Sequence, residues 1–308
     1  MGIIAVAGGT GSIGRTIVEA LVERGAHDVF VLTRKARESD NVKFLAVDYG
    51  DVNGIAQALE EARVDTVICA FGMESDAISQ AQINLIHAAE RSTVTKRFMV
   101  SGYDMLFKDE QMTWLPIARW ARDADKAVAA TNLEHTRVVN GLFLDYYGIP
   151  HWKSYLKPWI NGVHVPGKWA VLPGDGLSPI NFVTTKDMAR FVTRLMDSSG
   201  WKPVSFIAGQ TTTFKEICEI AERARGERFF VQYESLESLR NGRISFPEFV
   251  ETGLEGSGQS TESIFAMFHL TSATGGYTIT SDDTLDRRFP DIHITTAEEV
   301  IESSWRGR

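Results

Sequence analysis

The stretch from residue 3 to residue 24 reads IIAVAGGTGSIGRTIVEALVER, and it decides the fold. Its first five residues, 3–7, are an apolar run that predicts a buried strand. A glycine-rich segment follows, and residues 12–24 then carry apolar side chains at helical spacing. A strand, a glycine-rich turn and a helix in this order open a dinucleotide-binding βαβ unit, in which N–H groups at the helix start hold a pyrophosphate.

Each glycine of the turn GGTGSIG has a physical role. Gly8 permits the tight turn, Gly11 lets the backbone approach the pyrophosphate, and Gly14 lets the helix pack close to the strand. Ordinary turns also contain such triplets, but the strand before and the helix after favour a nucleotide site. Nucleotide contacts are expected from Gly8, Thr10, Gly11, Ser12, Ile13 and Gly14.

The end of the second predicted strand, residues 28–33, indicates which nucleotide binds. An NAD site places an Asp or Glu here to bind the ribose 2′-hydroxyl. This chain has Thr33, Arg34 and Lys35 instead. Arg34 can make paired hydrogen bonds to a 2′-phosphate, so the residues predict NADP(H). The alternative is that both cations are solvated charges in a loop.

Strands and helices alternate up to about residue 142. Further strands are predicted at 42–47, 66–71, 97–101 and 135–139, and further helices at 52–62, 77–90 and about 115–131. Apolar strands separated by helices predict an α/β fold with a doubly wound (Rossmann) parallel sheet.

The alternation of strands and helices stops at residues 140–179, which are dense in aromatic residues, Gly and Pro. One more strand and helix, over 181–196, return to the sheet, and 205–308 is mostly helical by period. The predicted organisation is an NADP(H)-binding Rossmann domain and a smaller, mostly helical substrate-binding region. Their boundaries are 1–150 with 180–207 for the first and 151–179 with 208–308 for the second.

Ligands of doubly wound sheets lie across the C-terminal ends of the strands. Residues at those ends are therefore expected at the cofactor. Asp48 and Tyr49 would border the adenine; Ala70, Phe71 and Gly72 would allow close approach of the ribose and nicotinamide; Ser101, Gly102 and Tyr103 would face the reactive ring. Alternatively, Asp48 caps the following helix and Phe71 belongs to the core.

Composition excludes several classes of protein. The 308 residues include 32 Lys and Arg against 40 Asp and Glu, and this net charge of −8 argues against broad nucleic-acid binding. Two cysteines, Cys69 and Cys218, offer no disulfide framework, which is typical of a cytoplasmic protein. No apolar run is long enough to span a membrane. HExxH, Walker A and GxSxG patterns are absent from the sequence, and no metal site is expected.

Several of these segments resemble one known family. GGTGSIG, the TRK after the second strand, RFMVSGYD and DKAVAATNLEHTRVVNGLF together resemble the NmrA-like and isoflavone-reductase-like branch of the atypical short-chain dehydrogenases. VLPGDGLSPINFVTTKDMARFV is similar to the family's return to the sheet. The resemblance covers about residues 1–200, and it implies NADPH and a smaller C-terminal substrate domain.

The resemblance also implies a role for Lys126. Isoflavone-reductase-like enzymes have a lysine at this place that contacts the cofactor near the nicotinamide and serves as the acid/base or orienting group, with Ser101 or Tyr103 assisting. The usual Tyr-x-x-x-Lys pair is missing, because Arg122 precedes Lys126 at that distance. The family's PSEFG reads VSGYD here, so the isoflavonoid substrate class does not carry over. The alternative for Lys126 is a helix-surface lysine beside two aspartates.

The predicted function is an NADPH-dependent oxidoreductase of the atypical short-chain dehydrogenase type, acting in secondary metabolism. Its substrate would be a small aromatic or polycyclic metabolite with a carbonyl, imine or conjugated alkene, because the aromatic residues of 140–179 suit a flat molecule. Two alternatives stay open. One is an NmrA-type redox-sensing regulator that binds NAD(P) without turnover and contacts a partner protein. The other is a redox-neutral dehydratase, isomerase or cyclase on the same fold.

Overall fold

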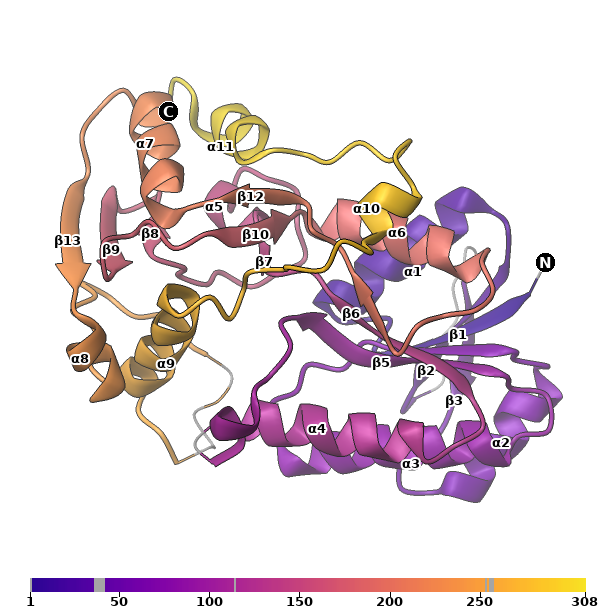
Figure 1. The fold of residues 1–308 in the computed structure, drawn as a ribbon. Coiled ribbons are helices and arrows are strands. Elements are labelled where there is room, and N and C mark those ends of the chain that lie inside the picture. Colours follow the sequence, from indigo (N-terminus) through magenta and orange to yellow (C-terminus); the bar gives the residue numbers. More distant parts are fainter. Residues whose placement is uncertain (1, 36–41, 114, 253, 255–257) are drawn as a thin grey trace. The chain divides into compact units, whose positions relative to one another are not determined.

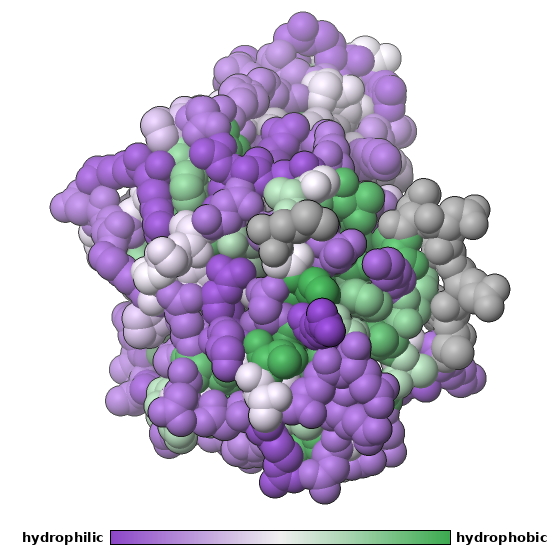
Figure 2. All heavy atoms as spheres, turned by 90° about the vertical axis from the view of Figure 1, so that its right-hand side faces the viewer, coloured by the Kyte–Doolittle hydropathy of each residue, from purple (hydrophilic) through white to green (hydrophobic). Residues whose placement is uncertain are grey.

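The computed structural model describes residues 2–35, 42–113, 115–252, 254 and 258–308. Every helix in these ranges is too short or too polar to cross a bilayer. The chain divides into two compact units. The first unit comprises Met1–Tyr103, Phe107–Val139 and Ala189–Ser205, and the second comprises Asp104–Leu106, Asn140–Met188 and Phe206–Arg308. The face drawn in Figure 2 is mostly hydrophilic, as expected for a chain with this many charged residues.

The first unit is built on a seven-stranded sheet with the order β11-β6-β5-β4-β1-β2-β3. The strands are β1 (Ile3–Ala7), β2 (Asp28–Thr33), β3 (Lys43–Ala46), β4 (Thr66–Cys69), β5 (Arg97–Asp104), β6 (Glu134–Val139) and β11 (Val204–Phe206). β1 pairs in parallel with β2 on one side and with β4 on the other. The strand order therefore reverses between β1 and β4, which is the switch point where doubly wound sheets bind ligands.

Helices cover both faces of this sheet. They are α1 (Ser12–Arg24), α2 (Val52–Glu61), α3 (Asp76–Arg91), the 3₁₀ helix η1 (Asp109–Thr113), α4 (Pro116–Ala129) and α6 (Thr185–Met196), which begins in the second unit. Figure 1 shows α2, α3 and α4 along one face and α1 on the other. Asp51 and Ser75 cap α2 and α3 by accepting hydrogen bonds from the N–H groups of Gly54 and Ile78.

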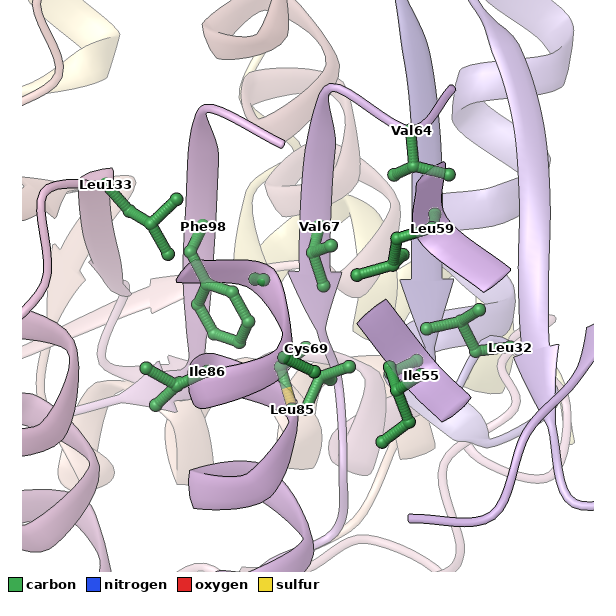
Figure 3. Close-up of a cluster of buried hydrophobic side chains, with 14 of the residues drawn as sticks. Leu32, Ile55, Leu59, Val64, Val67, Cys69, Leu85, Ile86, Phe98 and Leu133 are labelled. Atoms are coloured by element: carbon green, nitrogen blue, oxygen red, sulfur yellow. The ribbon is translucent and has the colours of Figure 1, made fainter. Parts of the chain in front are cut away.

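The core of the first unit lies between the sheet and α2, α3 and α4 (Figure 3). Leu59, Val67 and Phe98 are fully buried in it. Cys69 lies among them, and burial raises the pKa of its thiol to about 12. This cysteine is therefore a protonated packing residue, and the core holds β4 and β5 rigidly beneath the residues at their carboxyl ends.

The second unit contains two small sheets and several helices. The sheets have the orders β12-β10-β7 and β13-β9-β8. Their strands are β7 (Leu142–Phe143), β8 (Val163–His164), β9 (Trp169–Pro173), β10 (Ile180–Val183), β12 (Gln210–Thr212) and β13 (Phe230–Glu234). The helices are α5 (Asp145–Gly148), α7 (Phe214–Arg225), α8 (Leu236–Arg240), α9 (Thr261–Ala273), α10 (Leu285–Arg288) and α11 (Ala297–Trp305). An aromatic core that includes Trp169, Phe246 and Phe265 packs β9 against α8 and α9.

The observed boundaries confirm the doubly wound sheet and correct the organisation around it. The helix predicted at 12–24 and the strand predicted at 28–33 are found at these residues. Residues 140–150 and 180–188, which we expected in the Rossmann domain, belong to the second unit, because β7 pairs with β10 and not with the large sheet. The second unit is also less helical than expected. Its strands have only two to five residues, too few to show a period of two.

Candidate functional site

The turn after β1 can be built only with glycine. Gly8 has a φ of +76°, and a Cβ on it would lie 2.4 Å from the carbonyl oxygen of Ala70. A Cβ on Gly14 would lie 2.2 Å from the carbonyl oxygen of Gly8. The Gly11 N–H donates to that same oxygen at 2.9 Å, which closes the turn. The backbone thus runs close to the start of α1 and leaves room for a ligand's oxygens beside it.

The start of α1 offers hydrogen-bond donors. Gly11 is its N-cap, and within the described residues neither a capping side chain nor an acidic residue in the first turn is found. Arg15 is the residue whose N–H bonds back to the Gly11 carbonyl, so the N–H groups of Ser12, Ile13 and Gly14 precede the helical ladder. Thr10 and Gly11 are exposed. Three donors at the positive end of a helix dipole suit an anionic pyrophosphate.

The turn after β2 carries two cations. Arg34 and Lys35 are both exposed, whereas Thr33 is buried and its hydroxyl donates to the Lys35 carbonyl at 2.6 Å. This bond stabilises the turn that follows β2. β2 lies next to β1, so Arg34 follows a strand neighbouring the glycine turn. Such a place suits a cation that pairs with a ribose 2′-phosphate.

Tyr49 follows β3 and Phe71 follows β4, and their side chains are in contact. Their rings meet edge to face with centroids 5.0 Å apart, and the Tyr49 hydroxyl donates to the Leu32 carbonyl at 3.2 Å. Burial raises the pKa of Tyr49 above its ordinary range, and the nearby Arg34 charge opposes this rise. Asp48 is exposed and accepts a hydrogen bond from the Gly50 N–H, while Asp51 caps the next helix. Asp48 is thus an exposed turn residue next in sequence to the Tyr49–Phe71 ring pair.

The end of β4 lies directly beside the end of β1. The Ala70 N–H donates to the Ala7 carbonyl at 2.8 Å, and Ala70 itself is buried. Phe71 is half-buried and Gly72 is exposed. The small residues and the glycine turn thus lie together at the switch point, as predicted for a nucleotide that crosses the sheet there.

Ser101 has every polar group engaged inside the protein. Its N–H donates to Gln82 Oε1 at 2.8 Å, its hydroxyl donates to the Phe71 carbonyl at 2.9 Å, and its carbonyl accepts from Arg137 at 2.9 Å. Only 3% of the residue is exposed. A hydroxyl proton that is already donated to a backbone carbonyl is not offered to a ligand. Ser101 therefore links the end of β5 to the segment after β4 by a hydrogen bond.

Tyr103 does not present its hydroxyl at the edge of the sheet. Its backbone has a φ of +69°, and its hydroxyl donates to the Cys69 carbonyl at 3.0 Å. The side chain is 4% exposed, and burial raises its pKa well above the ordinary value. The structure thus places Tyr103 as a buried brace between β4 and β5, contrary to the expected position facing the reactive ring.

Lys126 also lies elsewhere than expected. It is an exposed residue in the last turn of α4. Arg137 reaches the carbonyl of Ala121 and the carbonyl of Ser101 together, so Ala121 marks the level of the strand end on this helix. Lys126 is five residues farther on, about 7.5 Å along the axis. After α4 the chain enters β6, where the Glu134 N–H meets the Lys96 carbonyl at the start of β5. Lys126 therefore lies toward the amino ends of the strands, away from the nucleotide end.

Two buried polar residues were missed by the sequence reasoning, namely Gln82 and Arg137. Gln82 is fully buried on α3, and Arg137 is 3% exposed on β6. Arg137 joins the Ser101 carbonyl, the Ala121 carbonyl and the carboxylate of Asp125, 2.8 Å from its nearest nitrogen. A signal was present in each case, because a polar residue stood at a position where the period of its helix or strand required an apolar one.

The residues at the carboxyl ends of β1, β2 and β4 fit a dinucleotide. The glycine turn leaves space that a Cβ would fill, the start of α1 supplies backbone donors, and Arg34 follows the neighbouring strand. When bound there, NADPH would supply a hydride. The protein's residues would hold its pyrophosphate at Gly11–Gly14 and its 2′-phosphate at Arg34.

Comparison with known proteins places the chain among others of this architecture. The model of the NmrA-like family matches residues 2–278. Oxidoreductase BOA1 of Botryotinia fuckeliana is 35% identical over 230 residues, which cover 73% of this chain and 77% of that protein. Oxidoreductase swnN of Metarhizium robertsii is 27% identical, covering 99% of this chain and 98% of that protein.

Among solved structures, the complex of AtPrR2 with NADP+ and (+)-pinoresinol has a similar fold. The TM-score is 0.75 at 20% sequence identity, and the match covers 98% of each chain. At this identity the likeness concerns the fold, and it confirms the doubly wound architecture predicted from the sequence.

Proposed function

The chain belongs to the NmrA-like family, and from this premise we propose that it is an NADPH-dependent reductase of a small aromatic or polycyclic metabolite. Two relatives that match most of the chain are named oxidoreductases, in agreement with the predicted enzyme class. NADP+ is the nucleotide in the AtPrR2 complex, in agreement with the predicted cofactor. The proposal extends to a carbonyl, imine or conjugated alkene as the reducible group and to a role in secondary metabolism.

One observation carries the proposal. The open glycine turn at the start of α1 and the exposed Arg34 follow neighbouring strands, β1 and β2, and no acidic residue stands at 33–35 to repel a phosphate. A carboxylate at this place would select the 2′-hydroxyl of NAD. Arg34 instead provides a planar guanidinium that can form two hydrogen bonds with a phosphate.

The oxidoreductase relatives favour an enzyme over a regulator that only binds nucleotide. Pinoresinol, the ligand of AtPrR2, is an aromatic compound, which supports an aromatic substrate class for the present chain.

The first test is nucleotide binding by the purified protein. We expect NADPH to bind at least about 10-fold more tightly than NADH, because a charge-assisted pair contributes about 1.5–3 kcal/mol. Replacing Arg34 by alanine should weaken NADPH about 10- to 100-fold and leave NADH unchanged. Arg91→Ala, an exposed arginine at the far end of α3, is the matched control and should alter neither affinity.

Equal affinities of the wild type for NADPH and NADH would contradict the cofactor assignment. Activity is then followed as NADPH oxidation, at 340 nm, with a panel of aromatic ketones, quinones and imines. Tight NADPH binding without oxidation by any of them would favour the nucleotide-sensing regulator instead.

A further inference from the structure

β13 is the outer strand of the small sheet β13-β9-β8 in the second unit (Figure 1). One edge of β13 pairs in parallel with β9, from Phe230 opposite Trp169 to Glu234 opposite Pro173. Within the described residues, no strand pairs with its second edge. β13 therefore presents backbone N–H and C=O groups to which a further strand can bind.

The side chains along this strand are apolar and exposed. Phe230 is 64% exposed, Tyr233 is 54% exposed and Val231 is 36% exposed. The first two are the most exposed large hydrophobic side chains of the described residues. Residues 230–233 include neither a charge nor a proline, the usual devices that prevent an edge strand from pairing. Such an unprotected edge is typical of a strand that has a partner.

The backbone directions of β13 follow from its hydrogen bonds to β9. The Phe230 N–H donates to the Lys168 carbonyl at 3.0 Å, and the Glu234 carbonyl accepts from the Gly174 N–H at 2.8 Å. Because backbone groups alternate in direction along a strand, those of the even-numbered residues of β13 face β9. The N–H and C=O groups of the odd-numbered residues face the open edge.

Val231 and Tyr233 are the odd-numbered residues of β13. The odd-numbered positions just outside the strand are already engaged within the chain. The Phe229 N–H donates to Glu222 Oε1 at 2.8 Å, and the Ser235 N–H donates to the side-chain carboxylate of the residue before it. A partner strand must therefore be in register with Val231 and Tyr233 to form its hydrogen bonds.

We propose that β13 is a self-association site, at which it pairs antiparallel with β13 of a second copy across a two-fold axis at Gln232. In this register Val231 of one copy lies opposite Tyr233 of the other. The two such pairs exchange four backbone hydrogen bonds, as residues directly opposite each other do at hydrogen-bonded positions of an antiparallel ladder. The contact joins the two three-stranded sheets into one and uses the open β13 edge of both copies, so the assembly closes as a dimer.

The charges beside the strand favour an antiparallel partner. Arg228 lies two residues before β13 with its side chain 89% exposed, although it also contacts Glu222. Glu237 lies three residues after β13 and is exposed. Glu227, beside Arg228, is already paired with Lys168. An antiparallel second copy brings Arg228 toward the end that carries Glu237, whereas a parallel copy would bring two Arg228 side chains together.

The area of the contact indicates its strength. An aromatic side chain buries about 150–250 Å², so the exposed parts of Phe230 and Tyr233 amount to about 180–300 Å² per copy. With Val231 and the strand backbone added, two copies bury less than the about 1,200 Å² of a standard interface. We therefore expect a weak dimer with a Kd of about 10–100 µM. Nucleotide binding takes no part in this contact, so the inference does not depend on the proposed reductase function.

The first measurement is sedimentation equilibrium of the full chain from about 5 to about 300 µM. The average mass should rise from 34.2 kDa toward twice that value. Val231→Pro removes an N–H that β9 does not use, and Tyr233→Lys adds a charge to the edge. Each should weaken the dimer at least about 10-fold. Val22→Lys, at an exposed apolar residue of α1, is the matched control and should leave the Kd within about 2-fold.

The second measurement tests the register by cross-linking. At the two-fold axis the two copies of Gln232 form a non-hydrogen-bonded pair with Cα atoms about 4.5 Å apart, which a disulfide can bridge. The two copies of Tyr233 are offset by two positions, about 8 Å apart, and a disulfide cannot bridge them. Under mild oxidation Gln232→Cys should form a covalent dimer at least about 10-fold faster than Tyr233→Cys. The native Cys69 and Cys218 are buried and should contribute nothing.

The outcomes are distinct from those of the nucleotide tests. A wild type that stays at 34.2 kDa up to about 300 µM would refute the proposal and favour an extended segment of a different protein as the occupant of the edge. A dimer that persists in both Val231→Pro and Tyr233→Lys, or equal cross-linking of the two cysteine variants, would also refute it. Gln232→Cys keeps every apolar residue of the strand, so it decides the register even if the proline variant does not fold. Thermal melting and NADPH affinity show that each variant is folded.

Discussion

The turn after β1 and the last residues of β5, Ser101–Asp104, lie in the same parallel sheet region, but they use their polar groups differently. After β1, the N–H groups of Ser12, Ile13 and Gly14 precede the hydrogen-bond ladder of α1. Near the end of β5, the Ser101 N–H and hydroxyl each donate a hydrogen bond within the protein, and its carbonyl accepts one. The turn after β1 has donors for a ligand, whereas the end of β5 uses its polar groups to hold strands together. Position at the strand ends is therefore not enough to make a residue part of the chemistry.

The largest effect on NADPH affinity is expected from adding a side chain to the glycine turn after β1. A Cβ on Gly14 would meet the Gly8 carbonyl oxygen at 2.2 Å, so Gly14→Ala must displace the turn and its three donors. We expect the affinity for NADPH to fall about 1,000-fold, about 4 kcal/mol, as measured by fluorescence titration. Gly25→Ala is the control, because nothing lies within 4 Å of a Cβ there. It should cost some stability through its positive φ but leave the affinity for NADPH unchanged.

The second prediction removes the arginine that holds the end of β5. Arg137→Met would leave the buried carbonyls of Ser101 and Ala121 without their donor and would remove the partner of Asp125. We expect the free energy of unfolding to fall by about 3 kcal/mol in urea titrations. Arg137→Lys keeps one charged donor and should lose less. A loss below about 1 kcal/mol in the methionine variant would show that the end of β5 is not held by this residue.

The contrast explains what the sequence could predict. The nucleotide end depends on backbone geometry, and glycines at fixed spacing between a strand and a helix reveal such geometry. The end of β5 depends on two side chains, Gln82 from α3 and Arg137 from β6, which lie 19 and 36 residues from Ser101. No local pattern shows that these groups meet. Ser101 and Tyr103 were thus correctly placed near a strand end, but the use of their hydroxyls could not be foreseen.

The second unit was predicted least well, for a related reason. Its strands are short and pair with segments distant in sequence, such as β13 with β9. Backbone hydrogen bonds join segments far apart in sequence there, such as those from the Asn140 N–H to the Asp104 carbonyl and from the Asn181 N–H to the Tyr277 carbonyl. Aromatic density in 140–179 did indicate a packed core, because aromatic residues bury large areas wherever they lie.

The third prediction concerns His269, a buried histidine of the second unit whose two ring nitrogens both have partners. His269 is 1% exposed, its Nε2 accepts the Gly162 N–H at 2.8 Å, and its Nδ1 lies 2.7 Å from the Phe265 carbonyl. The neutral ring satisfies both contacts, whereas a protonated ring would direct an N–H at the Gly162 N–H. Burial lowers the pKa of His269 from 6.5 to about 4.

The unfolded chain therefore binds this proton first, and stability is lost as the pH falls from about 6.5 toward about 4. Between pH 7 and pH 5 the loss should be about 2 kcal/mol, measured by urea unfolding. His269→Gln should flatten this part of the profile, and His293→Gln, at an exposed histidine, should not. An unchanged slope in His269→Gln would assign the acid sensitivity to other groups.

The smallest effect is expected at Lys126, where the structure and the family resemblance disagree most directly. The resemblance implies that Lys126→Ala abolishes turnover. The structure places this lysine in the exposed last turn of α4, about 7.5 Å along the helix from the level of Ser101. We therefore expect kcat, KM and NADPH affinity of Lys126→Ala to stay within about 2-fold of the wild type, as for the exposed control Lys96→Ala. A loss of kcat above about 100-fold would restore Lys126 as the acid/base or orienting group.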